Sequence, residues 1–432
     1  MRVLMFGWEF PPHISGGLGT ASYGLTKGMA TLDDLDVIFV VPKAWGDEDQ
    51  SVVKLIGANK IPVAYKKVYF KGFKKPFEKI EVTSKIVPYT DPEDFWKVVN
   101  SEVSGYQMFI ETNDKGRVDF SGRYDNNLMS EIEKYAVVAS VIAMENEFDI
   151  IHAHDWLAYP AGIAAMEVSG KPLVIHVHAT DFDRSGGNVN PDVYRIEKSG
   201  MDAASKIITV SNLTRDIVIN KYNIDPAKVE TVYNAVDPVA ISENMMVKKG
   251  FDEKVVTFLG RITMQKGPEY FIEAANKVLK KMGNVRFVMA GSGDMMEKMM
   301  RRAAALKITD RFHFTGFLKG PDVFSMLYMS DVYIMPSVSE PFGISPLEAM
   351  QSNVPVIISK QSGVAEVLTH AVKIDYWDID AMADAIYGIL NYPALANMFI
   401  INGKEEVIML KWDNSARHVR DIYYRVLGIS KN

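Results

Sequence analysis

The sequence predicts an α/β protein with two parallel sheets. Short runs rich in β-branched and aromatic residues alternate with amphipathic stretches along almost the whole chain, which is the pattern of βαβ units. Several of the short runs are apolar throughout, as strands buried on both faces are. The alternation occurs in two series, and each series requires a sheet of its own. We therefore expect two domains in the 432 residues.

The first series begins at the N-terminus. Its expected strands are Val3–Phe6, Asp36–Val41, Ile150–His152, Leu173–Val177, Lys206–Val210 and Val229–Val232. Helical spacing of apolar residues predicts helices over Ala158–Val168, Pro191–Asp202 and Asn212–Tyr222, and a helix-like stretch begins at Thr20.

The second series repeats this alternation. Its expected strands are Val255–Leu259, Val285–Ala290, Phe312–Thr315, Val332–Met335 and Val354–Ile358. The helices predicted between them are Glu269–Lys281, Met295–Leu306, Asp322–Tyr328 and Pro346–Met350.

The two series meet near residues 233–249, a polar and turn-prone stretch. Residues 42–129 interrupt the first series and include the run KKVYFKGFKKPFEK at 66–79. This run could be a patch for a polyanion. We favour a solvated edge hairpin, because charge runs are commonly exposed.

Composition excludes several classes of protein. The chain has no cysteine, so disulfides, thiolate metal sites and cysteine nucleophiles are excluded. Its 48 basic and 54 acidic residues give a net charge of −6, which provides no electrostatic footprint for nucleic acid or an anionic membrane. No window reaches the ~18 apolar residues of a membrane span. We expect a cytoplasmic enzyme with no nucleic-acid partner and no membrane span.

A glycine-rich loop follows the first strand. Gly16, Gly17 and Gly19 precede the first helix-like stretch. Their backbone amides could approach an anion at the helix N-terminus, where the helix dipole is positive. The same pattern also suits a tight strand-to-helix turn, and it is neither a dinucleotide fingerprint nor a Walker motif.

Polar side chains follow two further strands of the first series. His152, His154 and Asp155 end one strand, and His176 and His178 end the next. Four histidines could bind a metal ion, but no additional cluster lies nearby in the sequence to complete a ligand shell. We instead predict no metal, and expect Asp155 and His178 to face a polar ligand across adjacent strand ends.

The second series carries two motifs at strand ends. Arg261 and Lys266 lie within the glycine-flanked stretch 260–267, where they could bind a diphosphate or simply cap a helix. Glu340 and Glu348 flank a Phe-Gly pair at a helix start. Both carboxylates could reach the hydroxyls of a sugar or ribose.

Taken together, these motifs resemble those of retaining nucleotide-sugar glycosyltransferases with the GT-B fold, which has two Rossmann-like domains facing across a cleft. The similarity is to glycogen/starch synthases (family 5) and family 4 glycosyltransferases. It rests on Gly16-Gly17, His178, Gly260-Arg261, Gln265-Lys266-Gly267, Glu340-Pro341-Phe342-Gly343, Glu348 and Asn234-Ala235-Val236-Asp237. The resemblance implies an acceptor-side domain at 1–235, a nucleotide-sugar-binding domain at 236–412, and a C-terminal helix at 413–432 that crosses back to the first domain.

The resemblance implies five catalytic residues. Arg261 and Lys266 would neutralise the donor diphosphate as the glycosidic bond breaks. Glu340 would hold hydroxyls of the transferred sugar. Asp155 and His178 would contact that sugar at its reacting face.

It also implies a set of donor-binding residues: Gly16 and Gly17 near the diphosphate, Phe317 by the base, the amides of Phe342, Gly343 and Ile344 near the sugar and phosphates, and Glu348 on the ribose. One position departs from the bacterial glycogen synthases, which carry Lys where this chain has Ile14.

The expected function is transfer of glucose from ADP- or UDP-glucose to the end of an α-1,4-glucan, with retention and with no cofactor or metal required. Two alternatives stay open. One is a family 4 transferase that builds another glycan or glycoconjugate, and the other is a non-catalytic scaffold that binds a nucleotide sugar. The donor base, the acceptor and the oligomeric state are left open by the sequence.

Overall fold

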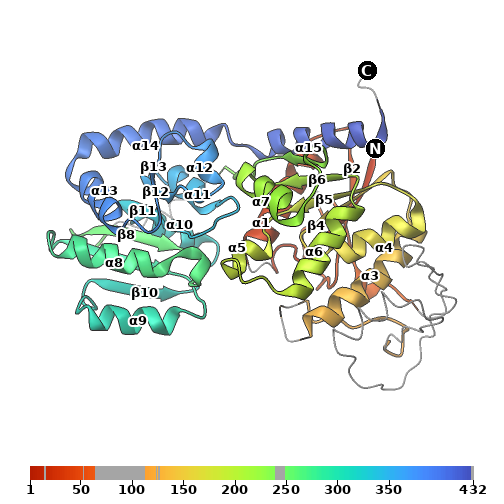
Figure 1. Cartoon of the computed structure of the whole chain (residues 1–432), viewed down its shortest axis with the longest axis horizontal. Coiled ribbons are helices and arrows are strands. Elements are labelled where there is room, and N and C mark those ends of the chain that lie inside the picture. Colours follow the sequence, from red (N-terminus) through yellow and green to blue (C-terminus); the bar gives the residue numbers. More distant parts are fainter. Residues whose placement is uncertain are drawn as a thin grey trace.

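The computed structural model describes residues 1–13, 16–51, 53–63, 112–122, 124, 127–238 and 249–429. These residues form two halves that lie side by side, each built around a parallel sheet with helices on its faces (Figure 1). The predicted fold class, two Rossmann-like α/β halves, is confirmed.

The first sheet contains seven described strands, and each neighbouring pair is parallel. Their order is β3 (Lys54–Gly57), β2 (Asp36–Val41), β1 (Arg2–Phe6), β4 (Ile150–His154), β5 (Leu173–Val177), β6 (Lys206–Thr209) and β7 (Val229–Thr231). The helices of this half are α1 (Gly17–Ala30), α3 (Leu128–Glu145), α4 (Tyr159–Ser169), α5 (Asp181–Ser185), α6 (Pro191–Ala203) and α7 (Asn212–Tyr222), with short 3₁₀ turns at Ala58–Lys60 and Pro226–Lys228. Strand order reverses between β1 and β4, so the switch point of the sheet lies there.

The second sheet is also parallel and contains six described strands. Their order is β10 (Phe312–Gly316), β9 (Val285–Ala290), β8 (Lys254–Leu259), β11 (Val332–Met335), β12 (Val356–Ser359) and β13 (Val372–Ile374). The remaining elements are a 3₁₀ turn at Met264–Lys266 and helices α8 (Pro268–Leu279), α9 (Met296–Ala305), α10 (Pro321–Tyr328), α11 (Ser345–Gln351), α12 (Val364–Val367), α13 (Ile379–Asn391), α14 (Pro393–Ile408) and α15 (Trp412–Leu427). Here the order reverses between β8 and β11.

Alternate residues of the strands enter two separate cores. Leu4 and Phe6 of β1 pack into a core that includes residues of α3 and α4. Val3 and Met5 face the other side, where the core includes residues of α1 and α15. Burial of both faces explains why these strands are apolar throughout.

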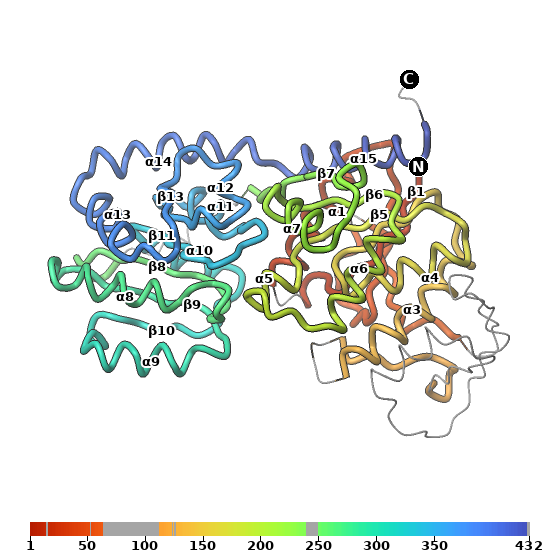
Figure 2. The backbone as a smooth tube through the Cα atoms, in the orientation of Figure 1, coloured from red at the N-terminus to blue at the C-terminus, as the bar shows by residue number. Residues whose placement is uncertain are grey.

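The last two helices follow different halves of the molecule. Figure 2 shows α14 along the second half and α15 along the first. Helix α15 packs closely against α1 because Gly24 and Gly28 have no side chain. A Cβ at Gly24 would lie 2.2 Å from the Trp412 ring, and one at Gly28 would lie 2.6 Å from the Trp412 carbonyl oxygen.

Most predicted elements lie within two residues of the observed ones, but three differences have physical reasons. Helix α1 begins at Gly17 rather than Thr20, because the glycines themselves adopt its first turn. Strand β12 begins at Val356 rather than Val354, since Pro355 has no N–H for the ladder. Strand β3 lies in the interrupting segment, where strands were expected but no bounds were predicted, and two of its four residues are only half-buried. The run at 66–79 lies outside the described residues, and the domain boundaries stay predictions.

Replacing Gly24 with alanine tests the packing of α15 on α1. Because the new methyl group would overlap the Trp412 ring, we expect the free energy of unfolding to fall by about 1–3 kcal/mol. Gly388→Ala is the matched control, since its Cβ would meet only Leu395 at 3.9 Å. That helix substitution should be stabilising by about 0.5–1 kcal/mol. Denaturant unfolding measures both, and equal effects would contradict the proposed close packing.

Candidate active site

Most of the predicted site residues follow the strands that flank the two switch points, while His178 follows β5 and Phe317 follows β10. Asp155 follows β4, and the glycine loop leads from β1 into α1. In the second half, Lys266 follows β8 and Glu340 follows β11. In open parallel sheets, ligands bind at the carboxyl ends of strands where the order reverses. Both halves therefore present chemically active side chains at the place where this architecture binds ligands.

The glycine loop leaves open space at the start of α1. Gly16 is the N-cap residue of that helix and has extended backbone. A Cβ on either Gly16 or Gly17 would meet no atom within 4 Å, so packing among the described residues does not require glycine at these positions. Open space at a helix N-terminus suits close approach of an anion. Ile14 lies outside the described residues.

Asp155 has unusual backbone geometry. Its φ is 61°, which is rare for a residue with a side chain and often marks a functional position. Its side chain is buried and accepts a hydrogen bond from Arg184 Nη2 at 2.8 Å. Burial raises the pKa of the Asp155 carboxyl, and the guanidinium opposes that shift. The other carboxylate oxygen, Oδ1, is buried without a hydrogen-bond partner in the protein.

Arg184 joins Asp155 to a second buried carboxylate, and sequence reasoning missed it. Its Nη1 lies 3.2 Å from Glu197 Oε1, and Glu197 also accepts hydrogen bonds from the Tyr222 hydroxyl and the Asp181 amide. The guanidinium thus compensates two buried acids and fixes the position of Asp155. Their spacing in sequence gave no signal, because the three residues lie on different elements.

His178 lies beside Asp155 in the fold, since β4 and β5 are neighbours. Its Nε2 lies 2.9 Å from Nδ1 of His154. Burial, with a further contribution from the charge of Arg184, lowers the pKa of His178 to about 3. The imidazole is therefore neutral at neutral pH.

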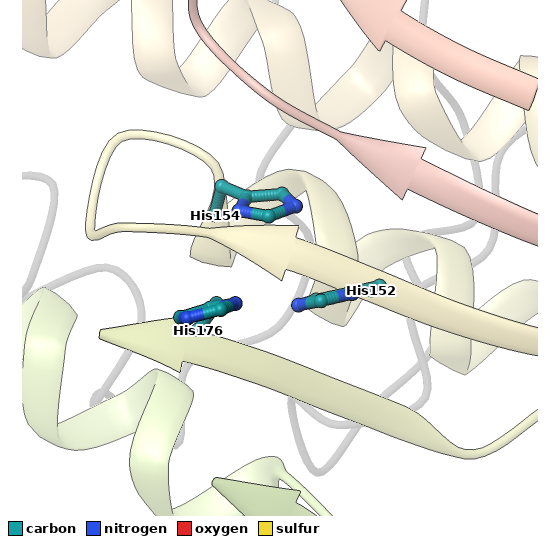
Figure 3. A group of neighbouring side chains, drawn as sticks. All are labelled: His152, His154 and His176. Carbon is teal, nitrogen blue, oxygen red and sulfur yellow. The ribbon is translucent and has the colours of Figure 1, made fainter. Parts of the chain in front are cut away.

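Three more histidines extend this group into the sheet. His152, His154 and His176 are buried on the face of the sheet covered by α1 and α15, with nitrogen atoms within 4.8 Å of one another (Figure 3). Among the described residues, a second group that could hold a metal ion is His13, Asp47 and Glu48, at the surface of the first half.

The second half brings together a cation and a carboxylate. Lys266 forms an ion pair with the buried side chain of Glu340, which also accepts a hydrogen bond from the Ser337 hydroxyl at 3.2 Å. Arg261 is exposed and donates to Gln265 at 3.3 Å. Gln265 in turn donates to the Ser339 carbonyl at 3.1 Å. Lys266, one of the predicted diphosphate cations, is therefore paired directly with Glu340, the predicted sugar carboxylate. Arg261, the other cation, is connected through Gln265 to Ser339, the residue before Glu340.

The Phe-Gly turn and the following helix complete this edge. Gly343 has a φ of 101°, which favours glycine. Phe342 is buried in the core, whereas Gly343 and Ile344 are half-buried before α11. Glu348 lies in the first turn of α11, and burial raises its pKa to about 7.

Phe317 lies away from this group, directly after β10. Phe317 is 55% exposed, and the Lys319 ammonium lies 5.8 Å from its ring centroid. An exposed aromatic face at a strand end is free to stack on a planar ligand.

The two halves contact each other at the ends of their strands. Ser339 donates to Asp183 Oδ1 at 2.6 Å. Glu366 accepts hydrogen bonds from the backbone amides of Asn212 and Leu213 at the start of α7. Neither cross-contact was predicted. Together they hold the polar edges of the two sheets next to each other.

Comparisons with known proteins agree with this arrangement. Residues 242–406 match the family described as Glycosyl transferases group 1, and residues 126–239 match Glycosyltransferase Family 4. An uncharacterised glycosyltransferase of Methanocaldococcus jannaschii is 28% identical over 98% of each chain. A glycogen synthase of Mycobacterium tuberculosis is 23% identical over 92% of this chain and 87% of its own.

Solved structures show the same fold. The sucrose-phosphate synthase of Thermosynechococcus elongatus aligns over 99% of this chain and 100% of its own, with a TM-score of 0.69 and 16% identity. The Anabaena protein HepE in complex with UDP-glucose aligns over 98% and 100%, with a TM-score of 0.64 and 14% identity.

These matches span both halves of the chain, and the fold is that of GT-B proteins. The chain is a glycosyltransferase of the GT-B class. Within that class it is similar to glycogen synthases and to family 4 glycosyltransferases. Among the described residues, no helix has the length and apolar character needed to cross a membrane.

Removal of Arg184 tests its role in the buried network. Arg184→Gln leaves Asp155 and Glu197 without their cation, so we expect the free energy of unfolding to fall by about 3 kcal/mol. The control is Arg302→Gln, which breaks an exposed pair with Glu273 and should cost no more than about 1 kcal/mol. Urea unfolding of the two variants decides the point. A loss at Arg184 no larger than the loss at Arg302 would show that the guanidinium does not support the buried acids.

Proposed function

We propose that the chain transfers glucose from a nucleotide-diphosphate-glucose to the end of an α-1,4-glucan, with retention of configuration. The observation that carries this proposal is that Asp155 and Lys266 follow strands at the two switch points, while Ser339 and Asp183 join the polar edges of the two halves. A donor held there would meet both sets of side chains. The glycogen synthase of Mycobacterium tuberculosis, which aligns with most of the chain, supports glucan as the acceptor.

The cations act on the leaving group. Negative charge grows on the donor diphosphate as the bond between the sugar C1 and the phosphate oxygen breaks. Arg261 binds the diphosphate as a fork and Lys266 as a point charge. Amides of Gly17 and of residues 342–344 add dipoles from either side. Because these groups supply positive charge, we expect transfer to proceed without added magnesium or manganese.

The carboxylates act on the sugars, and His178 contacts the transferred glucose at its reacting face. Glu340 and Asp155 each have a cation partner in the protein, and each holds an acceptor oxygen for a hydroxyl of the transferred glucose. The acceptor hydroxyl forms the new bond to C1 on the same face, and its proton passes to the leaving phosphate. No carboxylate nucleophile is needed on this route, in contrast to retaining glycosidases. Glu348 binds the ribose, and Phe317 stacks on the base.

A second candidate function is transfer to another glycan or glycoconjugate. It is favoured by the 26% identity over 61% of the chain to a 2-deoxystreptamine N-acetyl-D-glucosaminyltransferase of Niallia circulans. A donor screen separates the candidates. ADP-, UDP- and GDP-glucose are each supplied with maltooligosaccharides, and elongated products are measured. Elongation supports the proposal, and turnover only with other acceptors supports the alternative. Binding of donor without any turnover would identify a scaffold.

Lys266→Ala tests stabilisation of the leaving group. Because the charge develops mainly in the transition state, we expect kcat to fall by about 10²–10³. Lys360→Ala is the control, since that lysine pairs with Asp375 at the surface, and its kcat should be unchanged. Arg261→Lys should also be poorly active, because a point charge cannot replace the fork. If Lys266→Ala raises KM and leaves kcat unchanged, the residue merely binds substrate.

The raised pKa of Glu348 predicts a pH dependence of nucleotide binding. Below about 7 the carboxyl holds a proton in the unliganded enzyme, so one of its oxygens cannot accept a ribose hydroxyl. Binding favours the ionised form, and affinity for the nucleoside diphosphate should rise with pH up to about 7 and then level off.

Calorimetric titration across this pH range measures the effect, with Glu348→Gln as the control. The phosphate of the nucleotide titrates in both experiments, so the difference between the two proteins isolates Glu348. Parallel pH profiles in the two proteins would contradict a ribose contact through the ionised carboxylate.

A further inference from the structure

The four histidines form a block that follows from strand geometry. Residues two apart in a strand share a face, so His152 and His154 of β4 lie on the same side, as do His176 and His178 of the next strand. The parallel register pairs His154 with His176. Phe39, Trp412 and Tyr423 belong to the core on that side, which removes His152, His154 and His176 from solvent.

The nitrogen atoms of this block have few partners in the protein. His152 Nε2, His154 Nε2 and both ring nitrogens of His176 are buried without a hydrogen bond. Each such group costs about 1–3 kcal/mol when nothing satisfies it. Four unsatisfied nitrogens in one cluster therefore favour binding of an ion or water between them.

The hydrogen bonds that His152 and His154 do make use their Nδ1 atoms and leave their Nε2 atoms free to bind a metal ion. Nδ1 of His152 lies at hydrogen-bond distance from the Tyr423 hydroxyl, and Nδ1 of His154 from His178 Nε2. A histidine that binds a metal ion through one nitrogen typically donates its other N–H to a neighbour. In Figure 3 the rings of His152 and His176 point toward each other, and His154 lies across the gap between them.

We propose that His152, His154 and His176 bind a transition-metal ion, with zinc as the ion best suited, and with a water or hydroxide as fourth ligand. Imidazole ligands suit zinc, whereas magnesium and calcium require oxygen ligands, which this group lacks. Zinc–nitrogen bonds of about 2.0–2.1 Å place tetrahedral ligand atoms about 3.4 Å apart. The nitrogens already lie within 4.8 Å of one another. The rings are near-parallel, with His154 at 22–23° to the other two, so binding requires a rotation of the His154 ring that turns its Nε2 toward the ion.

A further observation agrees with this assignment. The His154–His178 contact links the proposed ion to the candidate active site. With His154 bound through Nε2, its Nδ1–H donates to His178 and fixes the tautomer of that residue. The inference does not depend on the proposed function.

The test measures metal content of the full-length chain made without a polyhistidine tag. The protein is stripped with a chelator, incubated with zinc sulfate and dialysed. We expect it to retain about one zinc ion per chain, and the ion to raise Tm. His176→Asn should lose both effects. Tyr423→Phe keeps the ligands but removes the partner of His152, and should weaken zinc affinity about 10–100-fold.

The surface group at His13, Asp47 and Glu48 supplies the matched control. His13→Asn should retain zinc as the wild type does, because that group is not the proposed site. If His176→Asn does not fold, cobalt(II) bound to the wild type decides, since a tetrahedral nitrogen-rich site gives intense visible bands and a hydrated surface ion gives weak ones. The proposal is overturned if the wild type retains no zinc, if His13→Asn rather than His176→Asn loses the zinc, or if cobalt gives only weak bands. Buried water would then be the occupant.

Discussion

The parallel direction of every described strand pair is the constraint on which the candidate site depends. Because all strands of a half end at the same edge of its sheet, the loops that follow them gather at that edge. Where the strand order reverses, two neighbouring loops diverge and leave a place for a ligand, and each sheet has one such reversal. The hydrogen bond from Ser339 to Asp183 then places one polar edge against the other. Thus a single ligand can be shared between residues that are more than one hundred positions apart in the sequence.

Charge compensation organises both parts of the site. Asp155 and Glu340 are buried carboxylates, and each is paired with a cation from its own half, Arg184 and Lys266. Such pairs lower the cost of burying an acid, and they fix its orientation. The arrangements differ in exposure to a ligand. Arg184 is held by a second acid, Glu197, and so stays in place. Lys266 has the single described pairing with Glu340, which a diphosphate can replace.

The sequence was sufficient for most of the fold because many buried parallel strands are apolar without interruption, as in Val3–Phe6 and Val332–Met335. It also placed the candidate residues at strand ends, since those positions follow directly from the strand bounds. The sequence did not predict the pairing of Arg184 with Glu197 or the contact of Glu366 with α7. These contacts join distant elements and therefore leave no periodic pattern in the sequence. The shared face of the four histidines needed the register of β4 against β5, which a single sequence does not specify.

The central claim is that residues of the first half act in the same transfer step as the cations of the second. Measurement of Asp155→Asn tests it most directly, because this substitution keeps the shape of the side chain and changes no residue of the second half. The account predicts that kcat falls by about 10² or more while the affinity for a nucleoside diphosphate stays within about twofold. A folded Asp155→Asn enzyme with the kcat of the wild type would contradict the account.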